Sequence, residues 1–150
     1  MPESNIRTEI KNILLGISGM GRVYDIQKSS FTEESVKTGF VFTDILSVWF
    51  IGDVSSKESM NVLGFGVPGG QSINHVYKIN GYYGVKESAN SRLSFSNLIS
   101  AISIAFRGNI TLNGSCFLHK YIEISVIDYE MFCNYLCHHT ELVLQVEERI

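Results

Sequence analysis

Four side chains near the C-terminal end of the sequence are of the types that bind zinc: Cys133, Cys137, His138 and His139. A closed zinc site needs four thiolate or imidazole ligands, commonly supplied as two separated pairs. In an extended strand, Cys133, Cys137 and His139 share one face, whereas His138 points to the other. The other cysteine, Cys116, supplies no second pair of ligands. We therefore expect no metal site and no cofactor, and interpret these residues as structural parts of a sheet.

Catalytic side chains are also difficult to assemble from this sequence. No serine lies in a GxSxG turn, and the four histidines follow no catalytic spacing. Glu147 and Glu148 are adjacent carboxylates, but neighbouring residues of a strand point to opposite faces. We expect no catalytic residue and no enzyme. One enzymatic alternative stays open, in which Cys137 acts with His139 or His119.

A glycine-rich segment at residues 64–69 (GFGVPG) matches the GxGxxG pattern of dinucleotide-binding proteins. That pattern binds a pyrophosphate when the glycines join a strand to the N-terminus of a helix. Here the following residues predict a strand, and Pro68 removes one backbone donor. We interpret the match as accidental and expect a loop with unusual backbone angles.

Composition predicts one globular domain over residues 1–150. The chain is 45% hydrophobic and 18% charged, with two prolines, which is typical of a folded domain. Its formal charge is −3 and its lysines and arginines form no cluster, so we expect no sequence-specific binding of nucleic acid. We expect neither a signal peptide nor a membrane span, because no run approaches the ~20 apolar residues that a span needs. Three cysteines, an odd number, favour a reducing cytoplasm.

Two segments have the hydrophobic period of amphipathic helices. The first covers residues 3–18, and Leu15 lies opposite its apolar stripe, which suggests a helix covered on two sides. The second begins near Asn90 or Ser91, either of which can cap it, and stops at Gly108. The two apolar stripes consist of Ile6, Ile10, Ile13, Leu14 and Ile17, and of Phe95, Leu98, Ile99, Ile102, Ala105 and Phe106.

Alternating or continuously apolar segments predict the strands. Residues 39–51 are apolar on both faces, which predicts a strand covered on both sides near the middle of a sheet. Gly81 interrupts another strand, which suggests a bulge or a second backbone passing closely. We expect strands at 21–27, 39–51, 75–85, 120–129 and 135–147, with a short helix opening at 32–35. The last two strands are expected to pair around residues 130–132, with Ile122, Ile124, Val126, Leu142, Leu144 and Val146 facing inward.

The segment over residues 54–71 is rich in glycine and serine, yet it contains Met60, Leu63, Phe65 and Val67. These side chains are too apolar for a loop that is merely solvated. The segment is either an open loop or a hairpin with a flexible tip, and such long connections are usually functional. We expect it to become ordered against a neighbouring molecule.

The order of elements predicts an α+β domain, with an antiparallel or mixed β-sheet and two main helices packed on one face. Leu93 and Ile104 lie nearly opposite the buried stripe of the second helix. Two explanations stay open: the first helix covers them, or they form a second apolar surface that contacts a neighbouring subunit.

Three stretches carry a resemblance to a known family. They are the opening helix with residues 19–25 (GMGRVYD), residues 75–84 (HVYKINGYYG) with the helix ending in AFR at 105–107, and residues 137–149 (CHHTELVLQVEER). Together and in this order, they resemble the tail terminator or tail-completion proteins of the neck of tailed bacteriophages. Residues 54–71 have no counterpart in the family pattern.

The resemblance implies a non-enzymatic structural protein of the virion, assembled in the host cytoplasm. It implies a ring, a hexamer, that caps the tail tube and takes part in head–tail joining. Its partners are then other copies of itself, the tail tube protein and the head–tail connector proteins. A closed ring needs two different contacting patches on each subunit. From the residues, our candidates for these patches are Leu93, Ile104, Met60, Leu63, Phe65 and Val67. The alternative function is a small α+β module that binds a ligand or a partner protein beside residues 64–70, without catalytic activity.

Overall fold

The structure, a computed structural model, describes residues 3–24, 41–42, 45–63, 67–85, 90–114, 116, 118–132 and 135–149. They contain two helices and seven strands, so the predicted α+β class is confirmed. The helices are α1 (Glu3–Leu15) and α3 (Ser91–Arg107). The strands are β1 (Arg22–Tyr24), β2 (Val41–Phe42), β3 (Ile45–Leu63), β4 (Val67–Gly84), β5 (Leu118–His119), β6 (Glu123–Phe132) and β7 (Tyr135–Arg149). The short helix predicted at 32–35 lies outside the described residues.

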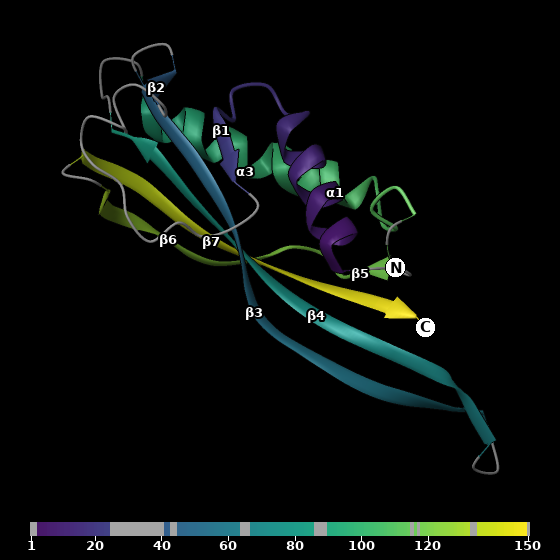
Figure 1. Cartoon of the computed structure of the whole chain (residues 1–150). Coiled ribbons are helices and arrows are strands. Elements are labelled where there is room, and N and C mark those ends of the chain that lie inside the picture. The colour runs from purple at the N-terminus through teal and green to yellow at the C-terminus, as the bar shows by residue number, and fades with distance from the viewer. Residues whose placement is uncertain are drawn as a thin grey trace.

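The strands form one mixed sheet in the order β1-β3-β4-β7-β5, with β2 paired to β3 and β6 paired to β7. β1 runs parallel to β3, and the other described pairs are antiparallel. Figure 1 shows α1 and α3 on the same face of this sheet. A single cluster of buried side chains joins both helices to the strands, as the sequence predicted.

α1 buries its apolar face against the sheet. Ile6, Ile10 and Leu14 are fully buried. The helix ends at Leu15, earlier than the predicted residue 18, and the N–H of Gly16 donates to the carbonyl of Asn12. Leu15 is 50% exposed, so the suggestion that this helix is covered on two sides is wrong for the described part of the chain.

α3 buries the predicted stripe, and neither expected side chain caps its start. Asn90 has left-handed backbone angles and makes no side-chain cap bond. The hydroxyl of Ser91 instead forms a hydrogen bond of 2.9 Å with Nε2 of His138. At the other end, the N–H of Gly108 donates to the carbonyl of Ile104, which closes the last turn where the sequence predicted the stop. The buried side chains of α3 are Ser91, Phe95, Leu98, Ile99, Ile102 and Phe106.

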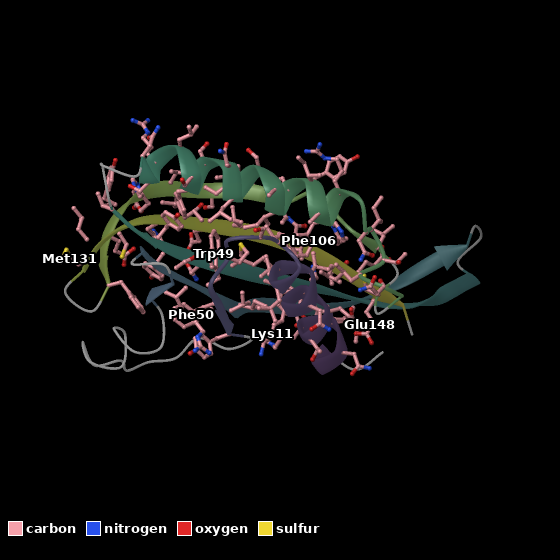
Figure 2. All side chains as sticks on the ribbon, turned by 90° about the horizontal axis from the view of Figure 1, so that it is seen from above. Lys11, Trp49, Phe50, Phe106, Met131 and Glu148 are labelled. Atoms are coloured by element: carbon pink, nitrogen blue, oxygen red, sulfur yellow. The ribbon has the colours of Figure 1, made fainter. Side chains whose placement is uncertain are left out.

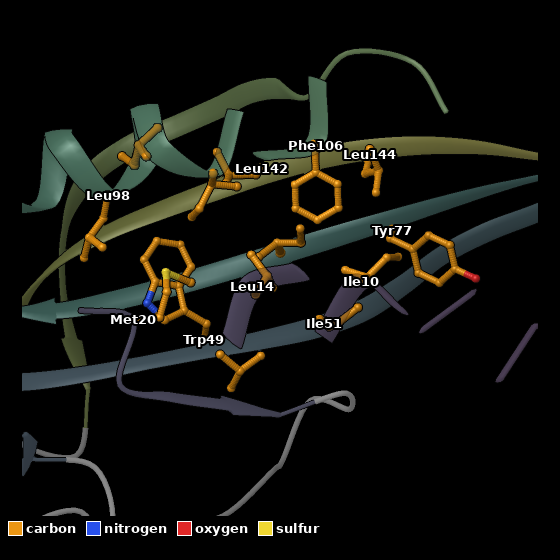
Figure 3. Close-up of a cluster of buried hydrophobic side chains, with 14 of the residues drawn as sticks. Ile10, Leu14, Met20, Trp49, Ile51, Tyr77, Leu98, Phe106, Leu142 and Leu144 are labelled. Carbon is orange, nitrogen blue, oxygen red and sulfur yellow. The ribbon is translucent and has the colours of Figure 1, made fainter. Parts of the chain in front are cut away.

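β3 carries apolar side chains to both faces of the sheet, as its continuous hydrophobic run predicted. Trp49 and Ile51 face the helices and belong to the main core (Figure 3). Val48 and Phe50 face the other way and cluster with Cys137. All of these side chains of β3 are fully buried, and burial of one such side chain contributes about 1.5–3 kcal/mol.

Gly81 of β4 provides space for the indole of Trp49, its cross-strand partner on β3. A Cβ at position 81 would lie 2.2 Å from Cζ3 of Trp49. The pairing is regular at this point, since the register shifts of the β3–β4 pair fall between Asp53 and Ser55 and between Asn61 and Val62. The expected bulge or close backbone at Gly81 is therefore wrong; a distant aromatic side chain explains the glycine.

Gly21 joins the first helix to the sheet through a close approach of two backbones. Its φ is +74°, and a Cβ there would lie 2.5 Å from the carbonyl oxygen of Ser47. The hydroxyl of Ser47 donates to the carbonyl of Met20 at 2.6 Å. Glycine alone meets both requirements without strain, which fixes where β1 enters the sheet.

The C-terminal hairpin differs from its prediction in two ways. β6 continues through Phe132, which pairs with Tyr135, so the turn lies after residues 130–132. A register shift between Ile124 and Val126 also interrupts the alternation. Ile124, opposite Leu142, faces the helices but is 46% exposed, whereas Val126, opposite Glu141, faces the other way, so the inward prediction is wrong for Val126. Ile122 packs against the main core as predicted. On β7, Leu142, Leu144 and Val146 are buried as predicted.

Candidate functional site

The segment at residues 54–71 belongs to a hairpin arm that extends past the rest of the sheet. Of the two alternatives that the sequence left open, the structure has the hairpin: β3 and β4 pair as far as Leu63 and Val67. β7 ends at Arg149, opposite Ser72. Beyond that pair, residues 59–63 and 67–71, here called the arm, pair only with each other among the described strands. Figure 1 shows β3 and β4 projecting beyond the C-terminal end of β7.

The arm strands differ in composition from the rest of β3 and β4 in that they carry no charged residue. Residues 59–72 contain no aspartate, glutamate, lysine or arginine. Met60 lies opposite Gln71, and Leu63 lies opposite Val67, so three of the predicted interface residues are on the arm strands. Phe65 lies outside the described residues. An isolated two-stranded ribbon is at best marginally stable in water, so the arm is a candidate contact surface.

A line of hydrogen bonds fixes the base of the arm. Ser56 of β3 and Nδ1 of His75 on β4 are 2.7 Å apart, and Nε2 of His75 lies 3.1 Å from Oε2 of Glu148 on β7. Burial raises the pKa of the Glu148 carboxyl, but hydrogen bonds, including the one from His75, bring that pKa below its ordinary value. In hydrolase triads, serine meets Nε2 and the acid meets Nδ1; here the two ring nitrogens are reversed. We assign this line the structural role of joining three neighbouring strands.

Leu93 and Ile104 lie on the outer surface of α3. Their exposed fractions are 55% and 64%. The first helix therefore does not cover them, and contact with a neighbouring subunit stays a prediction. They remain exposed apolar side chains suited to contact another molecule.

A second exposed apolar surface, which the sequence did not reveal, lies on β6. Its members on the helix side of the sheet are exposed by about half or more: Ile124, Ile127, Tyr129 and Met131. We call these four residues the β6 strip. β6 pairs with β7 along one edge and has no partner along the other among the described strands. Figure 2 shows Met131 at the end of the molecule opposite the arm, whereas Glu148 lies near the base of the arm.

A groove of about 380 Å³ separates the β6 strip from α3. Phe95 and Ile99 line it from the helix, and Ile127 and Tyr129 line it from β6. His138 also lines the groove and stacks on Phe95, with ring centroids 5.6 Å apart. Further polar side chains line it, among them Arg92, Ser96, Ser100 and Asp128. The groove therefore combines apolar and polar groups, a composition suited to a side chain or a small ligand.

His119 supports the C-terminal end of α3. Its Nε2 lies 2.8 Å from the carbonyl oxygen of Phe106, and its Nδ1 lies 2.7 Å from that of Lys120. These contacts join the last turn of α3 to the backbone beside β5.

The cysteines and histidines predicted as structural residues do not converge on one site. Cys137 is fully buried against Val48 and Phe50, while His138 points to the opposite face and His139 shares the face of Cys137. His119 pairs with Val146, and the strand from there to Cys137 spans roughly 30 Å at ~3.4 Å per residue. Cys137 and His119 are therefore too far apart to act together. Cys133 lies outside the described residues.

The residues that sequence reasoning missed belong to cross-strand pairs. His75 and Glu148 are 73 residues apart in the sequence, and no local pattern brings them together. Asp128 and His139 face each other across the C-terminal hairpin, and the exact strand register that pairs them was not part of the prediction.

Compared with known proteins, the chain matches no protein-family model, and no curated protein has a significantly similar sequence. Neither helix among the described residues is long and apolar enough to cross a membrane.

Proposed function

We propose that the chain is a structural subunit of the neck of a tailed bacteriophage, forming a closed ring that caps the tail tube and joins it to the head connector. The order of the three family-like stretches along the sequence supports this proposal. Six copies is the number that the resemblance implies. The subunit acts by binding other proteins, not by catalysis.

The arm is the observation that carries the proposal. It is an uncharged ribbon that leaves the body of the domain without a third strand. A neighbouring copy that received it would shield its backbone edges and its apolar side chains from water. Each apolar side chain fully buried in this way contributes about 1.5–3 kcal/mol before the entropy of ordering is subtracted.

The opposite end of the subunit offers the complementary patch. A ring closes through heterologous contacts, in which one patch of a subunit meets a different patch of the next. The arm lies at one end of the molecule and the β6 strip at the other (Figure 2). The arm of one copy can contact the β6 strip of the next copy, and this contact can repeat around a ring.

A loop exchange tests this role of the arm. Ser59 and Ser72 are cross-strand partners, so replacing residues 60–71 with Asn-Gly joins them through a two-residue turn that suits a hairpin. The expected result is a variant with the melting temperature of the parent chain that remains a monomer by native mass spectrometry. The parent chain is expected to form a closed oligomer under the same conditions. A matched control, Lys57→Ser, changes a charge on β3 outside the arm and should leave the oligomer intact.

Two outcomes of that exchange contradict the proposal. A variant that still forms the parent oligomer shows that the arm is not the ring contact. A variant that unfolds shows that the arm is part of the domain's own folding unit. In the second case the single change Leu63→Asp, at the last described pair of the arm, tests the contact without removing the strands.

The groove between α3 and β6 supports a second candidate, a small binding module without catalytic activity. Its apolar side chains from α3 and β6, beside polar groups such as the imidazole of His138, are suited to a ligand that carries one aromatic or aliphatic group and a polar group. Ile99→Trp would fill the groove. If that variant loses binding to a partner while the oligomer persists, the module function is favoured over the ring.

A further inference from the structure

Three potential metal ligands converge on the face of the C-terminal hairpin opposite the helices. Asp128 and Glu130 are two residues apart on β6, so their side chains point the same way, and His139 is the cross-strand partner of Asp128. Nδ1 of His139 lies 2.7 Å from Oδ1 of Asp128 and 3.1 Å from Oε2 of Glu130. The three ligand atoms all lie within 4.8 Å of one another.

The imidazole is held rigidly while the carboxylates face water. The side chain of His139 is 9% exposed, and its ring lies beside that of Tyr82 with centroids 4.9 Å apart. This contact fixes Nδ1 towards the two carboxylates. The side chains of Asp128 and Glu130 are 52% and 50% exposed. An ion can therefore reach the site from solvent.

The carboxylates of Asp128 and Glu130 place two negative charges within 4.8 Å of each other. A cation between the carboxylates relieves their repulsion.

We propose that Asp128, Glu130 and His139 form a binding site for a divalent transition-metal ion, of which Zn²⁺ is the probe of choice. One imidazole nitrogen with two carboxylate oxygens is a ligand set that zinc accepts, whereas Ca²⁺ and Mg²⁺ prefer oxygen alone. Ligands about 2.0–2.2 Å from one ion lie roughly 3–3.5 Å apart. The 3.1 Å from Nδ1 to Glu130 falls in this range, whereas the 2.7 Å from Nδ1 to Asp128 is a hydrogen-bond distance that must lengthen to admit the ion. Three protein ligands leave a fourth position open to water or to a neighbouring molecule.

This ligand set differs from the one considered in the sequence, which joined His139 to His138 and the cysteines and did not include Asp128 or Glu130. It does not rest on the ring function. The bound ion would link β6 to β7 near their turn and thereby stabilise an edge strand that has a partner on one side. The competing arrangement is an imidazolium whose proton on Nδ1 is shared by the two carboxylates, without metal.

Zinc titration of the metal-free chain distinguishes the two arrangements. Calorimetry with ZnCl₂ is expected to show one site, and the melting temperature should rise with zinc concentration because the ion binds the folded state. His139→Gln, Asp128→Asn and Glu130→Gln should each weaken zinc binding by at least tenfold. His138→Gln is the matched control, because His138 lies on the same strand but faces the helices. This variant should bind zinc like the parent chain.

Circular dichroism without zinc must show that the three ligand variants are folded. If one of them is unfolded, the comparison is made with Asp128→Ala, which removes one carboxylate and leaves His139 unchanged. Absence of saturable zinc binding to the parent chain overturns the proposal in favour of the imidazolium. Equal affinity in the parent and the three ligand variants overturns it too, because the ion then binds elsewhere.

Discussion

The indole of Trp49 occupies the space that a side chain at position 81 would need. The two residues face each other on β3 and β4, and a Cβ on Gly81 would lie within 2.6 Å of three atoms of the ring. Trp49 is fully buried, and its Nε1 has no hydrogen-bond partner among the described residues. The centre of the core therefore depends on the absence of one methyl group.

Gly81→Ala is expected to lower the free energy of unfolding by about 3 kcal/mol, because the indole must move within a closely packed core. Trp49 is the only tryptophan, so its fluorescence reports the displacement directly. Gly52→Ala is the matched control, since the nearest atom to its new Cβ would be 3.9 Å away. Equal stability of the two variants in urea would show that the close approach of Trp49 to Gly81 is not a constraint. In the double variant Trp49→Phe with Gly81→Ala, part of the loss should be recovered.

Ile102 and Ile104 test the two sides of α3. Ile102 is fully buried, whereas Ile104 is 64% exposed. Ile102→Asp places an unpaired charge in the core, at a cost of several kcal/mol that is comparable with the ~5–15 kcal/mol stability of a domain. We expect it to unfold the chain, whereas Ile104→Asp should leave it folded and unable to assemble. Circular dichroism and native mass spectrometry check both results. An Ile104→Asp chain that assembles normally would remove this face of α3 from the interface.

His138 makes stability depend on pH. Burial lowers the pKa of its imidazole, and the positive charge of Arg92 lowers it further. Above pH ~6.5 the ring is neutral in both the folded and the unfolded chain. As the pH falls below that value, the unfolded chain takes up the proton first, so the folded state loses stability. His138→Gln should lose less stability than the parent chain between pH 7.5 and pH 5. The free energy of unfolding of both chains is measured by urea denaturation at each pH. If it depends on pH identically in the two chains, protonation of His138 does not contribute.

The hydrophobic periodicity of the sequence predicted which side chains are buried in elements that present one face to the core. The stripe of α3 from Phe95 to Phe106 and the inward side chains Leu142, Leu144 and Val146 follow from spacing alone. Both lie in long elements that present one face to the core. The repeat of 3.6 or 2 residues then determines which side chains are inside.

Features set by contacts between distant segments were not predictable. The register shift between Ile124 and Val126 reverses the face of every residue that precedes it on β6, and nothing in the local composition marks it. Gly81 was recognised as special, but its cause is Trp49, which lies far away in the sequence. The pairing of His75 with Glu148 depends likewise on strand order, which periodicity does not give.

The neck-ring proposal is tested most directly by electron cryomicroscopy of purified tailed particles that contain this chain. The proposal predicts a closed ring of six copies at the junction of tail tube and head connector, with each arm lying on the adjacent subunit. Particles made with residues 60–71 replaced by Asn-Gly should lack the ring and have unjoined or uncapped tails. A chain that is absent from the particles, or a variant without the arm that still forms complete joined particles, would contradict the proposal.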